Sequence, residues 1–363
     1  MSFRILLFLL ATLFTEQVFA LSDTTHYSRD LSLSYGRGVF WAHRAHMTHL
    51  VGNTINSVEF EYEFKTKRNR YWKRVYDQPT IGIRAHFSDL GNPLLGQAYG
   101  LAPYYSFNLI KGKKLEWRSS IGMGLGMLSR HFDLYGNRKN IAIGSSINLY
   151  ASLNSSLRYA ISSRVALNFK AQFTHFSNAA VSMPNLGINV PALTMGVTWS
   201  NPKTEIIENP LQELIGFERR RIVLVSGIST RSVSILNDKR YPIFKASLEY
   251  QIRPKFKWLW GPSLDLSYNS AIVERLEVAQ VGSDLSYNMQ LGLSMKYHQI
   301  VGPVEICTAM GVFVLDKARR DGLFYHKLGG RLRLNKHWFL NSNIFSHWAK
   351  ADHFEVGLAY QIK

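Results

Sequence analysis

The chain has 363 residues, 46% of them hydrophobic, and its 43 Lys and Arg against 25 Asp and Glu give a formal net charge of +18. This composition excludes a disordered or collagen-like chain, and the single cysteine excludes an intramolecular disulfide framework and a cysteine-cluster zinc site. A charge of this size suggests nucleic acid or an anionic surface as a partner, and the compartment decides between them.

The first predicted element is a secretory signal peptide over residues 1–20. It has one basic residue, Arg4, an apolar run over 5–14 and a small residue, Ala20, at its end. A run of about ten residues is too short to span a membrane, so we favour cleavage near Ala20 over an N-terminal membrane anchor. An exported chain does not meet genomic DNA, and we therefore expect no nucleic-acid partner.

The rest of the chain alternates between apolar and polar residues with a period of two. In 141–159, for example, most odd positions are Ile, Leu, Ala or Tyr, and the even positions include Ser, Asn and Arg. Such long alternating segments are typical of a transmembrane β-barrel, because strands of soluble proteins are shorter, about 5–6 residues. About sixteen segments show the pattern: 31–40, 54–64, 80–88, 96–109, 114–128, 141–159, 164–177, 189–199, 220–230, 241–253, 258–269, 284–298, 301–315, 322–335, 337–348 and 353–362.

The segments predict an all-β, antiparallel transmembrane barrel in the outer membrane of a bacterium. They form two groups of eight, so we divide the chain into the signal peptide 1–20, a first eight-strand unit 21–200, a periplasmic connector 201–221 and a second eight-strand unit 222–363. We favour one barrel of about sixteen strands over two tandem eight-strand barrels, because two membrane barrels in one chain are unusual. Glycines on the polar faces argue the other way, since they suit a narrow, filled interior.

The candidate chemistry lies at the end of the segment 164–177. His175 and Ser177 are two residues apart on the apolar, lipid-facing side of this strand. A histidine beside a serine hydroxyl is the base and nucleophile pair of acyl transfer. Polar side chains on a lipid-facing surface are costly, which favours a functional role. The alternative is a pair of polar residues that close a strand at the membrane interface.

The sequence around this pair, THFSNAAVSMPNLGIN over Thr174–Asn189, resembles the outer-membrane lipid A 3-O-deacylase (acyloxyacyl hydrolase) family. That family has a His-x-Ser-Asn motif followed by Pro-Asn-x-Gly-Ile, and its known fold is a single eight-strand barrel, so the second half here is an addition. The resemblance implies that Ser177 is the nucleophile, that His175 is the general base and that Asn185 helps to hold the oxyanion. We place Asn178 with the substrate-binding residues.

The sequence departs from the family at the residue that orients the histidine. The family has a glutamate fourteen residues after the histidine, and this chain has Asn189. Asparagine can still orient a histidine by accepting its N–H. The spacing His175, Ser177, Asn189 also matches outer-membrane phospholipase A. We therefore expect a serine esterase that acts on lipid A, with an outer-membrane phospholipase A and a non-catalytic pore or structural barrel as alternatives.

The expected partners are lipid A or lipopolysaccharide and the outer-membrane lipids, without a metal or a cofactor, and the oligomeric state is not predicted. Basic residues near the outer rim could pair with lipid A phosphates, namely Arg130, Arg138 and Lys139. The densest basic runs, 65–74 and 219–221, fall in turns that would face the periplasm, where they could meet anionic headgroups.

Four other features have simpler explanations. Ala349 replaces the serine in the equivalent strand of the second half, beside His347, so we expect no second nucleophile and a structural role for His347. Cys307 falls on a lumen face. Three acidic residues on one strand face could form a metal or acid–base site: Glu59, Glu61 and Glu63. We favour the simpler explanation that they pair inside the barrel with Arg84, Arg118 and Lys170. The spacing of three between His43, His46 and His49 could bind a metal on a helix. We favour the explanation that they are surface histidines of an external loop.

Overall fold

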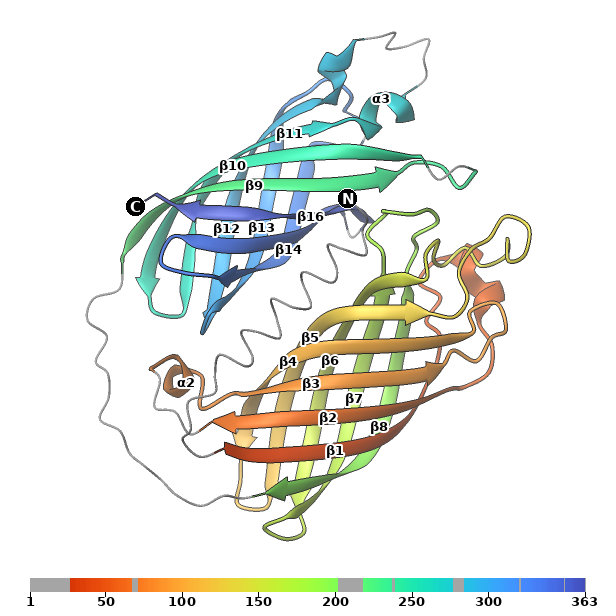
Figure 1. Cartoon of the computed structure of the whole chain (residues 1–363), viewed down its shortest axis with the longest axis vertical. Helices are drawn as coiled ribbons and strands as arrows, with labels where there is room; N and C mark the ends of the chain where they lie inside the picture. The colour runs from red at the N-terminus through yellow and green to blue at the C-terminus, as the bar shows by residue number, and fades with distance from the viewer. Residues whose placement is uncertain are drawn as a thin grey trace.

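The computed structural model contains two closed antiparallel β-barrels of eight strands each (Figure 1). It describes residues 27–66, 71–201, 218–236, 239–276, 284–319, 321–348 and 350–362. The predicted signal peptide 1–20 and most of the predicted connector 201–221 lie outside these residues. Among the helices of the described residues, none has the length and apolar character needed to cross a membrane.

The first barrel consists of β1 Tyr27–Gly38, β2 Ile55–Thr66, β3 Thr80–Asp89, β4 Gln97–Lys111, β5 Leu115–Leu128, β6 Ile147–Ala160, β7 Val165–Ser177 and β8 Ile188–Asn201. The second consists of β9 Arg220–Ser232, β10 Arg240–Lys255, β11 Trp258–Asn269, β12 Met289–Val301, β13 Val304–Asp316, β14 Phe324–Arg333, β15 Trp338–His347 and β16 Lys350–Gln361. Short helices lie in the connections: η1 Ala45–Leu50, α2 Tyr71–Val75, α3 Ala271–Arg275 and η2 Leu285–Asn288.

The prediction of one sixteen-strand barrel is wrong. Strand β1 pairs with β8, with Leu33 opposite Val197, and β9 pairs with β16, with Val225 opposite Ala359, so each group of eight closes on itself. The physical reason is the narrow interior that eight strands enclose. Interior glycines leave room for rings from other strands: a Cβ on Gly126 would lie 2.6 Å from the ring of Phe176.

The outer surfaces of both barrels are apolar and the interiors are polar. On β1, the side chains of Leu31, Leu33 and Tyr35 are exposed, whereas the alternate residues Asp30 and Ser32 are buried. The second barrel follows the same rule, with exposed apolar side chains along its strands such as Leu224, Ile228, Leu248 and Leu264. A closed barrel with an apolar exterior satisfies every backbone group internally and spans a lipid bilayer.

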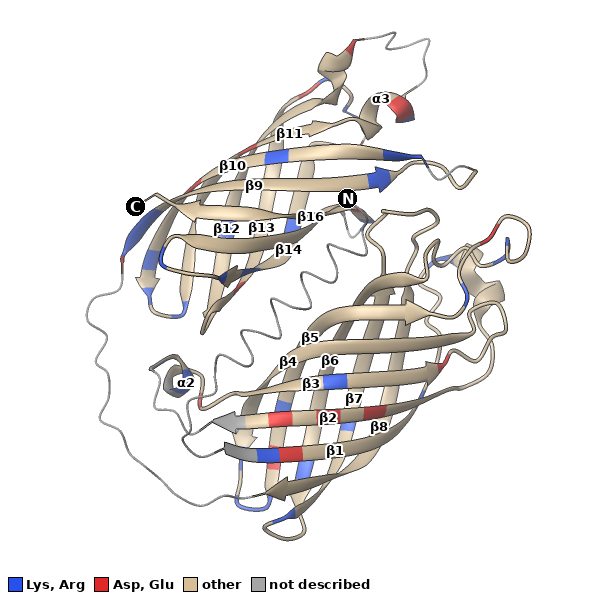
Figure 2. Ribbon diagram, viewed as in Figure 1, with Lys and Arg blue, Asp and Glu red and all other residues tan. Residues whose placement is uncertain are grey.

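Buried ion pairs fill the interior of the first barrel, and Figure 2 marks the acidic and basic positions along its strands. Arg84 contacts Glu61 at 2.6 Å, Lys170 contacts the same carboxylate at 2.7 Å, and Arg118 contacts Glu63 at 2.9 Å. Lys170 also contacts Glu59 at 3.3 Å, so the predicted interior pairing of the three glutamates is confirmed. The cavity left around this network has a volume of about 20 Å³, which holds no more than a water molecule and is not a channel.

The second barrel is filled in a similar way. Glu249 contacts Arg331 and Lys296, both at 2.6 Å, and Arg221 contacts Glu305 at 2.7 Å. Cys307 lies on this lumen face, as predicted, and it is buried. The charges that the sequence places on the polar faces therefore neutralise one another within each barrel, where a lone buried charge would be costly.

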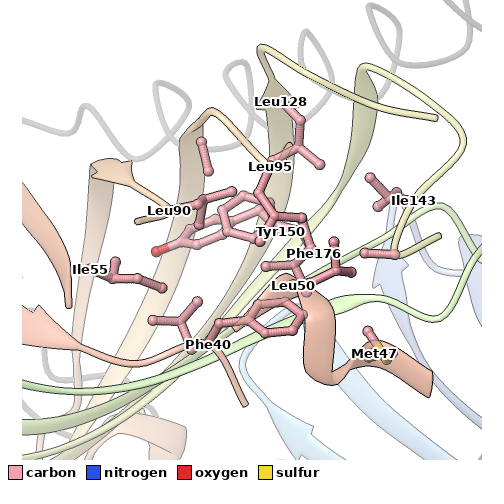
Figure 3. Close-up of a cluster of buried hydrophobic side chains, with 14 of the residues drawn as sticks. Phe40, Met47, Leu50, Ile55, Leu90, Leu95, Leu128, Ile143, Tyr150 and Phe176 are labelled. Carbon is pink, nitrogen blue, oxygen red and sulfur yellow. The ribbon is translucent and has the colours of Figure 1, made fainter. Parts of the chain in front are cut away.

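One end of the first barrel is closed by an apolar cluster (Figure 3). Met47 and Leu50 of η1 pack with Phe176 of β7, Tyr150 of β6 and Ile143 of the loop before β6. The connections that follow β1, β3, β5 and β7 emerge at this end. The cluster gives these loops a rigid base, because close-packed side chains leave little freedom to the backbone above them.

Candidate active site

The hairpin of β7 and β8 brings the predicted histidine and asparagine together. His175 and Asn189 are direct partners across the two strands, which explains the spacing of fourteen residues. The Nδ1 atom of His175 lies 2.6 Å from Oδ1 of Asn189. A carbonyl oxygen only accepts hydrogen bonds, so Nδ1 of His175 carries the proton and the lone pair of the ring is on Nε2.

Ser177 follows on the same face of β7, since the intervening Phe176 points into the buried cluster. The serine Oγ lies 3.2 Å from Oδ1 and 3.1 Å from Nδ2 of Asn185. The main-chain N–H of Asn178 donates to the same Oδ1 at 3.0 Å. This bond fixes the Asn185 amide with both its oxygen and its nitrogen within hydrogen-bond distance of the serine oxygen.

The serine hydroxyl does not form a hydrogen bond with His175 among the bonds of the described residues; its side-chain partner is Asn185. In enzymes without substrate, such bonds are often long and tighten only when substrate binds. His175 and Ser177 lie on one face of β7, because strand residues two apart share a face.

Two loops hold this arrangement in place. The main-chain N–H groups of Leu186 and Gly187 both donate to the carbonyl oxygen of Ala142, at 2.9 Å, and Ile143 forms an isolated β-bridge with Asn185. Gly187 has a φ of +84°, and a Cβ there would lie only 2.8 Å from Cε1 of His175. The glycine of the Pro-Asn-x-Gly-Ile sequence is therefore required by both the backbone conformation and the approach of the histidine ring.

The residues predicted to bind substrate differ in their surroundings. Asn178 is buried, and its Nδ2 donates to Oγ of Ser145 at 2.8 Å, so it links the two loops. Arg130, Arg138 and Lys139 are exposed in the loop between β5 and β6. This loop contacts the Asn185 segment through Ala142, which places the three cations in the loop that helps to form the site.

A cavity of about 590 Å³ lies against the outer wall of the barrel below the site. Its lining includes Phe173 of β7, two residues before His175 on the same face, together with Ala171 and Leu193. The lining extends across Arg37–Val39 at the end of β1 and Leu153 of β6. This volume is that of a small-molecule site, and its mainly apolar wall suits a hydrocarbon chain.

His43, which the sequence predicts to be one of three surface histidines, contacts the site. The Nδ1 atom of His43 lies 2.9 Å from Nδ2 of Asn189. His49 instead bonds through Nε2 to the carbonyl oxygen of Lys139 at 2.8 Å, and among the bonds of the described residues neither His46 nor His49 reaches Asn189. The three histidines lie in one short segment. Their spacing was the only signal in the sequence, and it does not single out His43.

The second barrel contains a cluster that the sequence did not suggest. Single oxygen or nitrogen atoms of Asp321, His347 and Asp352 lie within 4.8 Å of one another. Arg275 pairs with Asp321 at 2.8 Å, and Arg231 pairs with Asp352. Each carboxylate already has a guanidinium partner, so the cluster is explained as an ion-pair network and gives no support to a metal site.

Comparison with known proteins gives a family for each half of the chain. Residues 56–198 match the family described as lipid A 3-O-deacylase (PagL), and residues 219–363 match the family described as acyloxyacyl hydrolase, C-terminal domain. No curated protein matches the sequence at a significant level.

Three solved structures illustrate the structural similarity. The outer membrane enzyme PagL is 17% identical over 46% of this chain and 97% of its own, with a TM-score of 0.34. Neisserial surface protein A is 8% identical over 48% of this chain and 96% of its own, with a TM-score of 0.32. A mutant of the Rh. blastica porin is 12% identical over 93% of this chain and 100% of its own, with a TM-score of 0.22.

Proposed function

Because the chain belongs to the lipid A 3-O-deacylase (acyloxyacyl hydrolase) family and is an outer-membrane lipid A deacylase, we propose that it works as a serine esterase with Ser177 as nucleophile. His175 is the general base, Asn189 orients it, and Asn185 stabilises the oxyanion. The observation that carries the proposal is the 2.6 Å contact between Nδ1 of His175 and Oδ1 of Asn189. It leaves Nε2 as a base on the face that Ser177 occupies.

In the first half of the reaction, Ser177 Oγ attacks the ester carbonyl of an acyl chain while Nε2 of His175 takes the hydroxyl proton. The carbonyl oxygen becomes negative, and Nδ2 of Asn185, 3.1 Å from Oγ in the resting state, donates to it. Loss of one such donor costs about 10²–10³ in rate in a well-studied protease. The histidine then gives its proton to the departing sugar oxygen, which leaves an acyl-serine.

In the second half, water gives a proton to His175 and attacks the acyl-serine, and the proton returns to Ser177 as the fatty acid leaves. Asn189 accepts from His175 throughout but carries no charge. It can therefore fix the tautomer and orientation of the imidazole, but it stabilises the imidazolium less than a carboxylate does. The substitution of asparagine for the glutamate of the family predicts a slower enzyme, not an inactive one.

Access to the site supports a lipid substrate. Ser177 lies at the end of β7, two residues from His175 on the same face, and is 8% exposed; we propose that a lipid reaches it laterally from the leaflet. The cavity of about 590 Å³ below the site could hold an acyl chain, and we propose that Arg130, Arg138 and Lys139 pair with the phosphates of lipid A. In the sequence of the second half, Ala349 replaces the serine beside His347; Ala349 lies outside the described residues, and we propose that the second half is non-catalytic.

Phospholipase A activity is a second candidate, because the spacing of His175, Ser177 and Asn189 resembles that of outer-membrane phospholipase A. Mass spectrometry of lipids from expressing cells separates the two. We expect lipid A that has lost one ester-linked acyl chain and no accumulation of lysophospholipid. Ser177→Ala should abolish the change, whereas Ser162→Ala in the turn between β6 and β7 should not. Unchanged deacylation by Ser177→Ala would refute the proposal.

A further inference from the structure

The segment that follows β1 continues alongside β8 and carries His43 to the site. The main-chain N–H of Val39 donates to Pro191 O at 3.1 Å, and that of Trp41 donates to Asn189 O at 2.9 Å. Beyond this point Met47 and Leu50 anchor η1 in the apolar cluster (Figure 3). His43 is thus held from both sides, and its Nδ1 reaches Nδ2 of Asn189 at 2.9 Å.

An asparagine that orients a histidine has a weakness that a carboxylate lacks. The two ends of its amide differ, since the oxygen only accepts and the nitrogen only donates. If the amide of Asn189 turned over, its NH₂ group would face Nδ1 of His175. That nitrogen would then have to accept, the ring proton would move to Nε2, and the ring could not take the proton of Ser177.

We propose that His43 is a positioning residue that fixes the orientation of the Asn189 amide. The Asn189 nitrogen donates to Nδ1 of His43, which holds Oδ1 toward His175. Among the bonds of the described residues, Nδ2 of Asn189 has no other partner. His43 is exposed and acts only through Asn189, so the chain of contacts runs His43, Asn189, His175, Ser177. This inference rests on the proposed function of the last three.

A double-mutant cycle on the full-length chain in detergent, with purified lipid A as substrate, tests the inference. His43→Ala should lower kcat about fivefold, the equivalent of about 1 kcal/mol for one hydrogen bond, and leave KM unchanged. Asn189→Asp has the same size but two equivalent oxygens, so it needs no partner to direct it. In the Asn189→Asp background, His43→Ala should therefore change kcat less than twofold.

Two further variants replace the side chain by one of similar reach. His43→Gln offers an acceptor oxygen and should keep more than half of the activity, whereas His43→Lys offers only donors and should lose at least as much as His43→Ala. The comparison of His43→Gln with His43→Lys tests whether position 43 must accept a hydrogen bond, even if Asn189→Asp alone proves inactive. His46→Ala, at a neighbouring exposed histidine in η1, serves as the matched control and should leave kcat unchanged in both backgrounds.

An equal loss on His43→Ala in both backgrounds would show that His43 merely supports the loop and would overturn the inference. Full activity of His43→Ala, or of His43→Lys, would overturn it as well. Failure of the proposed function looks different, because Ser177→Ala or His175→Ala would then remain active. If Ser177→Ala and His175→Ala are inactive, but His43→Ala, His43→Gln and His43→Lys all have the same kcat, only the role of His43 is refuted.

Discussion

Replacement of Gly187 by alanine tests how closely the histidine ring depends on the loop beside it. An alanine Cβ would lie 2.8 Å from Cε1 of His175 and 3.3 Å from the carbonyl oxygen of Phe176. Carbon atoms pack at about 3.5–4.0 Å, so the ring or the loop must move by about 0.7 Å or more. The φ of +84° adds backbone strain of about 1–2 kcal/mol for a residue with a Cβ.

Displacement of a catalytic group by about 1 Å can cost 10²-fold in rate, so we expect Gly187→Ala to lower kcat roughly fiftyfold. The assay is release of fatty acid from lipid A by the purified chain, with thermal unfolding measured in parallel. Gly322→Ala is a matched control, because Gly322 has a φ of +88° and nothing within 4 Å of the added Cβ. It should show the strain without the loss of activity. A folded Gly187→Ala variant within threefold of the wild-type rate would refute this reasoning.

Two other predictions concern the barrel interior and the outer loop. Arg84→Met should leave the buried Glu61 without its guanidinium partner and lower the free energy of unfolding by about 3–5 kcal/mol, measured by denaturant titration; a loss below 1 kcal/mol would contradict the role of the network. Combined replacement of Arg130, Arg138 and Lys139 by glutamine should raise KM for lipid A at least fivefold while KM for a dephosphorylated lipid A is unchanged, and equal effects on both substrates would exclude a phosphate contact.

The strands and much of the site could be predicted because they depend on local patterns. Alternation with a period of two locates the strands without knowledge of their partners. The same period places His175 and Ser177 on one face, and a hairpin between adjacent strands returns Asn189 to His175. These features follow from neighbouring segments, so a single sequence contains them.

The number of barrels could not be predicted in the same way, because closure depends on contacts between distant segments. Strand β8 could have paired with β9 instead of β1, because the apolar face of β8 does not indicate which of the two is its partner. The useful signal was the run of interior glycines Gly122, Gly124 and Gly126, which indicates a narrow lumen. A Cβ on Gly124 would lie 2.1 Å from the carbonyl oxygen of Leu101. The rarity of two barrels in one chain is a weaker signal than these glycines.

The contact of His43 with Asn189 could not be predicted from the sequence either. It is separated from Asn189 by 146 residues, and it lies in a loop whose path is set by two backbone bonds to β8 and by the burial of Met47. No periodic pattern covers such a segment. A polar residue that acts through a second polar residue has no motif of its own.

The central claim is that Ser177 is the nucleophile, and covalent labelling tests it most directly. The purified chain would be treated with a long-chain alkyl fluorophosphonate, which phosphonylates activated serines, and digested for peptide mass spectrometry. We predict that the label is found on Ser177, that its appearance parallels the loss of lipid A deacylation, and that His175→Ala prevents both. Inactivation with the label on another residue, or full labelling without loss of activity, would contradict the claim.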